Sequence, residues 1–280
     1  MMKHLITGSS GFLASNLYAN SSNYSDYELT GRTNNRITEL NANFINSTEL
    51  FKINRSYDTI FHLAAQLAGK NTSSKDLFDA NVNLTKELVT KINYKKFIYA
   101  SSVSVFGQNE KNEVLNEDSR ILNPEEYGIS KYWGEQIVKS SPEFSIIRFS
   151  SIYGPNMNEN TLIPIYINQA LNYGLITIWG DGSRKQNYIH VNDAANLLLK
   201  AKDSEKNGIY LGTQTKEYSN LEIAEIIAGY TSTKIDFKGT DYSSSFFYNN
   251  DKTRSLMKWE PQIDIEKGII DYIKWKEKQF

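Results

Sequence analysis

A tyrosine and a lysine in the middle of the chain have a spacing suited to proton transfer. Tyr127-Gly-Ile-Ser-Lys131 would place a phenol and an ammonium one helical turn apart on the same face of a helix. A free phenol titrates near ~10, so it acts as a base at neutral pH only where positive charge lies close. The spacing alone identifies no site, because it recurs at Tyr230/Lys234, Tyr248/Lys252 and Tyr272/Lys276.

Two hydroxyl side chains upstream give the tyrosine its context. Ser101 and Ser102 follow residues 97–100, an apolar run typical of a buried strand, and Tyr127 comes 25 residues after Ser102. Parallel strands bring their carboxyl ends to one edge of a sheet, where ligands bind. Without the tyrosine, a polar strand end or a helix cap would explain both serines.

The N-terminal segment contains a glycine-bearing turn between an apolar run and a helical pattern. It reads Leu5-Ile-Thr-Gly-Ser-Ser-Gly-Phe-Leu-Ala14. Glycines let the backbone approach a pyrophosphate, and unpaired N–H groups at a helix start face the anion. Any tight strand-to-helix turn can look similar, but the early position and the small Ala14 favour a dinucleotide site. The residues expected to contact the dinucleotide are Gly8, Ser10, Gly11, Phe12 and Leu13.

The second expected strand ends at Gly31 and Arg32. A NAD site commonly has an acid here, about 20 residues after the glycine turn, to hold the ribose 2′-hydroxyl. Arg32, with Arg36 close behind, would stabilise a 2′-phosphate better, so we expect NADP(H), with NAD(H) as the alternative. A solvated surface arginine is the other explanation of Arg32, and Glu28 is a nearby but poorly placed acid.

Composition limits the classes of partner. The 280 residues carry 31 basic and 32 acidic side chains, so the net charge of −1 attracts neither nucleic acid nor an anionic membrane. No run approaches the about 20 apolar residues of a membrane span, and the N-terminus lacks a signal peptide's apolar core. We therefore expect a cytoplasmic protein with a small-molecule partner. The absence of cysteine and the three scattered histidines argue against a metal site.

Short apolar runs alternate with amphipathic stretches, which is the pattern of parallel βαβ units. Strands are predicted at residues 5–6, 27–30, 43–45, 59–63, 97–100 and 145–149. Helices are predicted from residue 12 and at residues 75–93, 127–140, 162–172, 191–202, 221–229 and 265–276. The expected fold class is α/β, a Rossmann-type doubly wound parallel sheet with a smaller C-terminal substrate-binding domain. Residues 1–150, completed by 189–205, would bind the dinucleotide, and 151–188 with 206–280 the substrate.

Together with motifs further along, these features resemble the extended short-chain dehydrogenase/reductases of the nucleotide-sugar epimerase/dehydratase family. The likeness runs from Leu5 to about Trp275. Its motifs, in chain order, are the TGxxGFL turn, His62-Leu-Ala-Ala-Gln66, Asn81, Ser101-Ser-Val-Ser-Val-Phe-Gly107, Tyr127-xxx-Lys131, Arg148-Phe-Ser-Ser-Ile-Tyr-Gly-Pro155, Gly180-Asp-Gly-Ser183 with Tyr188-Ile-His-Val-Asn-Asp193, and Asp251-xx-Arg254 with Trp259-Glu-Pro261.

The resemblance implies roles for individual residues. Ser102 would hold the substrate's reacting oxygen, Tyr127 would be the acid or base on that oxygen, and Lys131 would bind the nicotinamide ribose and favour the phenolate. Further cofactor contacts are implied for Asn46, Leu63, Ala64, Ala65, Asn81 and Ser101. Substrate contacts are implied for Gln66, Ser102, Val103, Ser151, Leu162, Arg184 and Tyr188.

The chain departs from the family pattern where relatives commonly hold the substrate's diphosphate. Ser151 stands where Asn is usual, Gln186-Asn187 replace an Arg-Asp pair, and the tail lacks its usual Arg before Asp251. Arg184 is therefore the best candidate for a phosphate clamp.

The preferred interpretation is NADPH-dependent reduction of a nucleotide-linked 4-keto-6-deoxy sugar. It rests on Arg32, on the modest length, and on Val103-Ser104, which stand where sugar dehydratases carry an Asp-Glu pair and so disfavour a 4,6-dehydratase. The alternative is an NAD-dependent nucleotide-sugar 4-epimerase, which uses the same residues but retains its cofactor. A non-catalytic dinucleotide-binding sensor is a third interpretation, against which the intact Ser102, Tyr127 and Lys131 argue. By analogy, the helices at 75–93 and 127–140 imply a homodimer.

Overall fold

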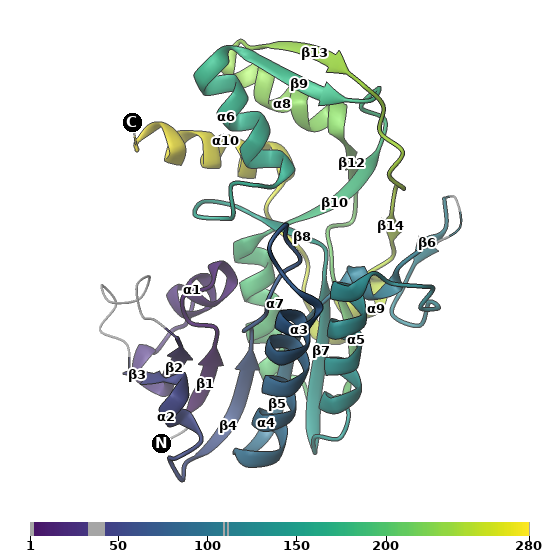
Figure 1. Ribbon diagram of the computed structural model, residues 1–280. Coiled ribbons are helices and arrows are strands. Elements are labelled where there is room, and N and C mark those ends of the chain that lie inside the picture. Colours follow the sequence, from purple (N-terminus) through teal and green to yellow (C-terminus); the bar gives the residue numbers. More distant parts are fainter. Residues whose placement is uncertain (1–2, 33–42, 109, 111, 280) are drawn as a thin grey trace.

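The computed structural model describes residues 3–32, 43–108, 110 and 112–279. A large sheet flanked by helices forms the lower part of Figure 1, and a smaller group of helices and short strands forms the upper part. Over these ranges, no helix is long and apolar enough to cross a membrane.

The lower part is built on a parallel sheet that has seven strands in the described residues. The strand order β11-β7-β5-β4-β1-β2-β3 reverses its direction between β1 and β4, and ligands of doubly wound sheets bind at such a switch point. The strands are β1 (His4–Thr7), β2 (Tyr27–Gly31), β3 (Asn43–Asn46), β4 (Ser56–His62), β5 (Asn93–Ser102), β7 (Glu143–Phe149) and β11 (Gly208–Gly212). The expected Rossmann-type α/β fold is confirmed.

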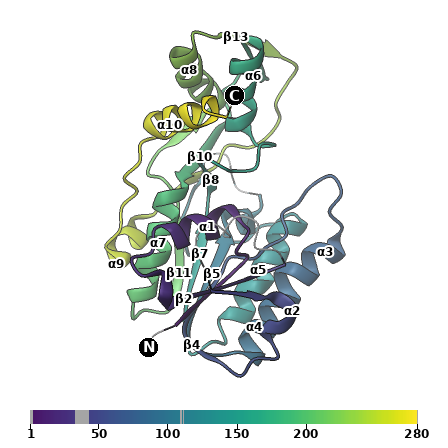
Figure 2. The ribbon, with the colours of Figure 1, turned by 90° about the vertical axis from the view of Figure 1, so that its left-hand side faces the viewer.

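Helices cover both faces of this sheet, which explains why its strands are apolar on both sides (Figure 2). One face carries α1 (Phe12–Ala19), α7 (Val191–Asp203) and α9 (Asp251–Met257). The other face carries α2 (Ser47–Leu50), α4 (Leu84–Lys91) and α5 (Glu126–Val138). Neighbouring strand residues alternate between the two cores: Ile6 and Phe61 face the α1 side, and Leu5 and Ile60 the α5 side. A slip of one residue would exchange the two cores, so the register is fixed.

The helix predicted at 75–93 is interrupted. It consists of α3 (Ser74–Phe78), a π-type turn over Asp79–Asn83, and α4, and β5 already begins at Asn93. The turn brings Asn81 inside, where its side chain is fully buried and hydrogen-bonded. Such bulges are frequent at functional sites.

The upper part has an apolar core of its own between helices and short strands. Its helices are α6 (Leu162–Tyr173), α8 (Asn220–Thr231) and α10 (Ile265–Glu277). Its strands are β8 (Ser151–Tyr153), β9 (Leu175–Trp179), β10 (Lys185–His190), β12 (Glu217–Ser219) and β13 (Lys234–Lys238). The short pair β6 (Val114–Leu115) and β14 (Phe247–Tyr248) lies beside the junction of the two parts (Figure 1).

Two features differ from the sequence-based expectation. Residues 208–212 were expected in the substrate region, but they form β11 and pair with β7 as the last strand of the large sheet. The strands of the upper part were not predicted at all. Most contain only three to five residues, too few for an alternating pattern to stand out.

Candidate active site

The turn after β1 packs against the end of β4 at the switch point of the sheet. Gly8 has a φ of 72°, and the Gly11 N–H donates to the Gly8 carbonyl at 2.7 Å. A Cβ on Gly8 would lie 2.7 Å from the backbone of Ala64, so a larger residue cannot fit. Leu63 and Ala64 also donate their N–H groups to the Thr7 hydroxyl, each at 3.2 Å. The turn and two of the predicted cofactor contacts thus form one packed unit.

Helix α1 begins beside this unit with an uncapped N-terminus. Gly11 is the N-cap residue and has no side chain to cap the helix, and the first turn contains no acid. Ser10, Phe12 and Leu13 flank this point. Free N–H groups at the positive end of a helix dipole suit a pyrophosphate. The residues present therefore fit a dinucleotide whose phosphates lie at α1.

Among the described residues, the carboxyl end of β2 offers no carboxylate for a ribose. Gly31 and the exposed Arg32 occupy it, and Arg36 lies outside the described residues. Glu28 is buried three residues earlier and accepts hydrogen bonds from Lys3, Arg55 and Tyr57. Burial alone would raise the pKa of Glu28, but these partners hold it below its ordinary value. Asn46, at the end of β3, accepts from Thr48 N at 3.0 Å and so caps α2.

Asn81 links the end of β4 to helix α5. Its Oδ1 accepts from Gln66 N at 2.8 Å, and its Nδ2 donates to Gln66 O at 3.0 Å and to Ser130 Oγ at 2.9 Å. Ser130 Oγ in turn donates to the Tyr127 carbonyl at 2.8 Å. The buried amide therefore fixes the first turn of α5, which carries Tyr127.

Ser102 and Tyr127 face each other at the carboxyl edge of the sheet. Ser102 ends β5, and its hydroxyl lies close enough to the Tyr127 phenol to act on the pKa of that phenol. The same hydroxyl accepts from Ser104 N at 3.1 Å and donates to Ser104 Oγ at 3.0 Å. Lys131 follows one turn later on α5 and is almost fully buried. The three predicted catalytic residues therefore come from two adjoining elements, β5 and α5.

Burial shifts both titrating groups of this cluster toward their neutral forms. It raises the pKa of Tyr127 to about 12, while the nearby Ser102 hydroxyl acts in the opposite direction. It lowers the pKa of Lys131 to about 7, against the attraction of the Glu135 carboxylate. Lys131 Nζ lies 4.1 Å from the centroid of the Tyr99 ring, a cation–π contact. A lysine that titrates near neutral pH is typical of functional sites.

A buried ion pair, which sequence analysis missed, fixes the next turn of α5. Arg148 Nε and Nη2 donate to the two carboxylate oxygens of Glu135 at 2.9 and 2.8 Å, and both side chains are almost fully buried. Ser101 Oγ donates to the same carboxylate at 2.6 Å. The hydroxyl of Ser101, a predicted cofactor contact, is thus used inside the protein to join β5 to α5. The available signal was the spacing of Glu135, four residues after Lys131 on one helix face.

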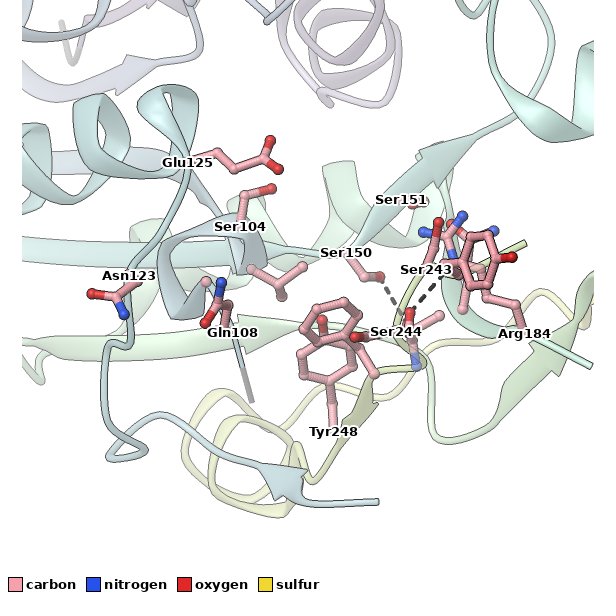
Figure 3. Close-up of a pocket in the computed structure, with 16 residues that line it drawn as sticks. Ser104, Gln108, Asn123, Glu125, Ser150, Ser151, Arg184, Ser243, Ser244 and Tyr248 are labelled. Atoms are coloured by element: carbon pink, nitrogen blue, oxygen red, sulfur yellow. Dashed lines mark hydrogen bonds between the residues drawn. The ribbon is translucent and has the colours of Figure 1, made fainter. Parts of the chain in front are cut away.

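A cavity of 570 Å³ lies beside the cluster (Figure 3). Three predicted substrate contacts, Val103, Ser151 and Arg184, line it. Hydroxyl and amide groups dominate the rest of its wall, and they belong to Ser104, Gln108, Asn123, Ser150, Gln186, Asn187, Tyr242, Ser243, Ser244 and Tyr248. Among the described lining residues only Glu125 and Arg184 are charged, and they stand at opposite ends of the view in Figure 3.

A second cavity of 390 Å³ adjoins the first at Arg184, which lines both. Its wall is more apolar and includes Leu162, Tyr166 and Trp179. Leu162, a predicted substrate contact, therefore lines the second cavity and not the first.

Some predicted contacts line neither cavity. Tyr188 is buried in the upper core, where its hydroxyl accepts from Gln186 Nε2 at 3.0 Å. The Gln66 backbone is held by Asn81, and its side chain donates to Leu67 O at 3.2 Å. Ala65 is exposed just after the end of β4. Tyr188 has its place in the packing of the upper part rather than in the wall of a cavity.

Comparisons with known proteins agree with this geometry. Residues 4–211 match the model of the NAD dependent epimerase/dehydratase family. A putative UDP-glucose 4-epimerase from Methanocaldococcus jannaschii is 28% identical to the chain, with 97% of each protein covered. A dTDP-D-glucose 4,6-dehydratase from Dictyostelium discoideum is 32% identical, with 81% of this chain and 62% of that protein covered.

The fold is also similar to that of solved structures. One is a UDP-glucuronic acid 4-epimerase from Bacillus cereus in complex with UDP-glucuronic acid and NAD. It superposes with a TM-score of 0.86 over 100% of both chains, at 22% sequence identity. At this identity the likeness describes the fold.

The pKa of Lys131 leads to a prediction about stability. Unfolded lysine keeps its proton up to about pH 10.4, whereas folded Lys131 releases it near pH 7, so the unfolded state binds more protons in between. Raising the pH through this window therefore stabilises the wild type relative to Lys131→Met, by up to about 1.4 kcal/mol per pH unit. Urea unfolding of both proteins between pH 7.5 and 9.5 measures the difference.

The control is Lys139→Met, at the exposed end of the same helix. Its difference from the wild type should stay constant across the same pH range. If the wild-type and Lys131→Met curves also run parallel, the buried lysine is not titrating as described.

Proposed function

The chain belongs to the NAD dependent epimerase/dehydratase family, and we propose that it is a 4-epimerase of a nucleotide-linked hexose that retains its NAD(H). The observation that carries the proposal is the cluster of Ser102, Tyr127 and Lys131 beside a cavity of hydroxyl and amide groups. Two of the similar proteins support it: one is named as a putative UDP-glucose 4-epimerase, and the other is a UDP-glucuronic acid 4-epimerase solved with NAD.

Each residue of the cluster has a chemical task in such a reaction. When bound, the nicotinamide ring accepts and returns the hydride. Tyr127 takes the proton from the sugar hydroxyl during oxidation and gives it back during reduction, and Ser102 holds the same oxygen. Burial raises the pKa of Tyr127 to about 12, so deprotonation of the phenol needs positive charge nearby. Lys131 in its protonated form, which the pKa of about 7 leaves populated at neutral pH, would supply that charge together with an oxidised nicotinamide when one is bound.

Dehydration is a poorer fit to this cavity. The Dictyostelium relative is named as a dTDP-D-glucose 4,6-dehydratase. Loss of water from a sugar needs a base that removes a carbon-bound proton and an acid that protonates the departing hydroxyl. Here Val103 and Ser104 follow Ser102, and neither can remove a carbon-bound proton at neutral pH. The interpretation as an enzyme that oxidises and reduces one carbon is therefore preferred.

The two cavities suit the two halves of a nucleotide sugar. Arg184 lines both, and its guanidinium is the group best suited to a diphosphate. The second cavity, with Trp179 and Tyr166, provides aromatic surface for a base. The first cavity, with its hydroxyl and amide groups beside Ser102, then receives the sugar.

Replacement of the catalytic phenol tests this proposal. Tyr127→Phe should lower kcat for interconversion of UDP-glucose and UDP-galactose by about 100-fold or more, because the proton acceptor is lost. NAD content and the unfolding temperature should not change. Tyr230→Phe is the matched control: Tyr230 has the same spacing to a lysine but lies on α8, away from both cavities. Full activity in Tyr127→Phe would overturn the assignment.

A second function, the NADPH-dependent ketoreductase, is favoured by one observation. β2 ends in Gly31 and the exposed Arg32, and the carboxylate of Glu28 is held by other side chains. A 2′-phosphate is therefore better served here than a 2′-hydroxyl. A reductase exchanges its cofactor at every turnover, whereas the epimerase keeps it.

Cofactor binding separates the two functions. For the reductase, the protein is isolated empty, prefers NADPH, and Arg32→Ala weakens NADPH about tenfold or more while NADH is unaffected. For the epimerase, NAD is isolated with the protein, and Arg32→Ala leaves its content unchanged. Fluorescence titration and analysis of the cofactor released on denaturation give both results.

We also infer that the protein pairs through α3 and α5. Phe78 and Trp133 form an edge-to-face contact at 5.6 Å and remain 40% and 53% exposed, and Ile129 nearby is 47% exposed. Such an apolar surface across two adjacent helices is typical of an interface between copies.

A further inference from the structure

We propose that Glu125 selects the sugar, so that the site accepts a neutral hexosyl group and rejects a hexuronate. The inference rests on the proposed function, because it names the substrate class of the same site. It is carried by the position of one carboxylate in the cavity wall.

Glu125 stands at the start of α5, two residues before Tyr127. It is the N-cap residue, but its side chain makes no cap hydrogen bond. In Figure 3 the side chain reaches from the helix start toward Ser104. In the part of the chain that the structure describes, no ion pair involves this carboxylate. Its charge is thus open to whatever occupies the cavity.

The backbone keeps Glu125 at this wall. A Cβ on Gly128 would lie 2.2 Å from the Ser104 carbonyl, so the first turn of α5 packs directly on the 3-10 helix after β5 (Val103–Phe106). Asn81 holds the same turn from the other side through Ser130. Ser104 has a short side chain, which leaves the carboxylate of Glu125 uncovered.

The two charged residues of the cavity wall would face different parts of the ligand. Arg184 lies at the far end from Glu125 and donates through Nε to Ser244 O at 3.4 Å. Since it also borders the second cavity, its charge is placed for the diphosphate. Among the described lining residues no second cation remains to neutralise a carboxylate on the sugar.

The chemistry of the two sugars then decides the preference. A hydroxymethyl group can donate a hydrogen bond to the Glu125 carboxylate, but an ionised uronate only accepts. Two like charges within one cavity also repel each other. The Bacillus cereus structure holds UDP-glucuronic acid on the same fold, so fold likeness and charge layout predict opposite outcomes for this ligand.

Binding of a matched pair of ligands tests the inference. UDP-glucose and UDP-glucuronate are titrated calorimetrically into cofactor-loaded protein, in a Tyr127→Phe background that prevents turnover. UDP alone is titrated as well and reports on the nucleotide site. We expect UDP-glucose to bind about tenfold or more tighter than UDP-glucuronate, with the ratio falling as salt is raised.

Two further variants identify the residue responsible. Glu125→Gln keeps the size of the side chain and should reduce the preference to about threefold or less by strengthening UDP-glucuronate. Glu126→Gln is the matched control, because Glu126 is the adjacent exposed acid but accepts from Ser74 Oγ at 2.8 Å and does not line the cavity. It should leave the ratio unchanged.

The outcomes separate this inference from the proposed function. Equal binding of the two sugars, or an unchanged ratio in Glu125→Gln, overturns the role of Glu125 while UDP binding upholds the nucleotide-sugar site. Failure of UDP and both UDP-sugars to bind overturns the proposed function and this inference together.

Discussion

The burial of one lysine is the constraint on which the site depends. Lys131 is 1% exposed, and removing its ammonium from water disfavours the charged form. The face of Tyr99 and the carboxylate of Glu135 partly offset this penalty. Glu135 is in turn balanced by Arg148, so charges alternate in sign from the active site into the core. This order places a lysine that titrates near neutral pH one helical turn after Tyr127.

Close packing of α5 on the sheet makes that burial feasible. A Cβ on Gly134 would lie 2.3 Å from Tyr99 Oη, so the absence of a side chain there lets the helix approach β5. His62 supports the same region from the end of β4. Its ring nitrogens bond the hydroxyls of Thr7 at 2.7 Å and Thr85 at 2.9 Å, and burial, aided by the charge of Lys131, lowers its pKa to about 3. The neutral imidazole thus ties β1, and with it the turn at Gly8, to α4.

Much of the large sheet could be predicted, because its signals are local. Parallel strands covered on both faces give continuous apolar runs, and the helical spacing of Tyr127 and Lys131 gains its meaning from the serines at the end of the preceding strand. Glu135 and Arg148 are 13 residues apart and meet only because α5 packs across the ends of β5 and β7. Tyr188 lies in a motif that suggested a ligand contact, yet the short strand β10 turns it into the upper core.

The cavity itself could be predicted least from the sequence. Its wall combines the start of α5, the 3-10 helix after β5, strand β10 and the tail before β14, and their contacts are set by tertiary packing. Glu125 went unnoticed because an acid before a helix usually signals a cap, and the cap bond is absent here. The sequence shows that family residues near Arg184 are replaced, as at Gln186 and Asn187. It does not show that Glu125 and Arg184 would be the charged residues of the described cavity wall.

The most direct test of the account is proton NMR of the purified protein with UDP-galactose in D₂O, with no cofactor added. Oxidation and re-reduction of the same carbon on a retained cofactor predicts conversion to UDP-glucose with the original hydrogen kept at C4. Absence of conversion, or deuterium appearing at C4, would contradict the assignment of Ser102, Tyr127 and Lys131 to hydride-based epimerisation.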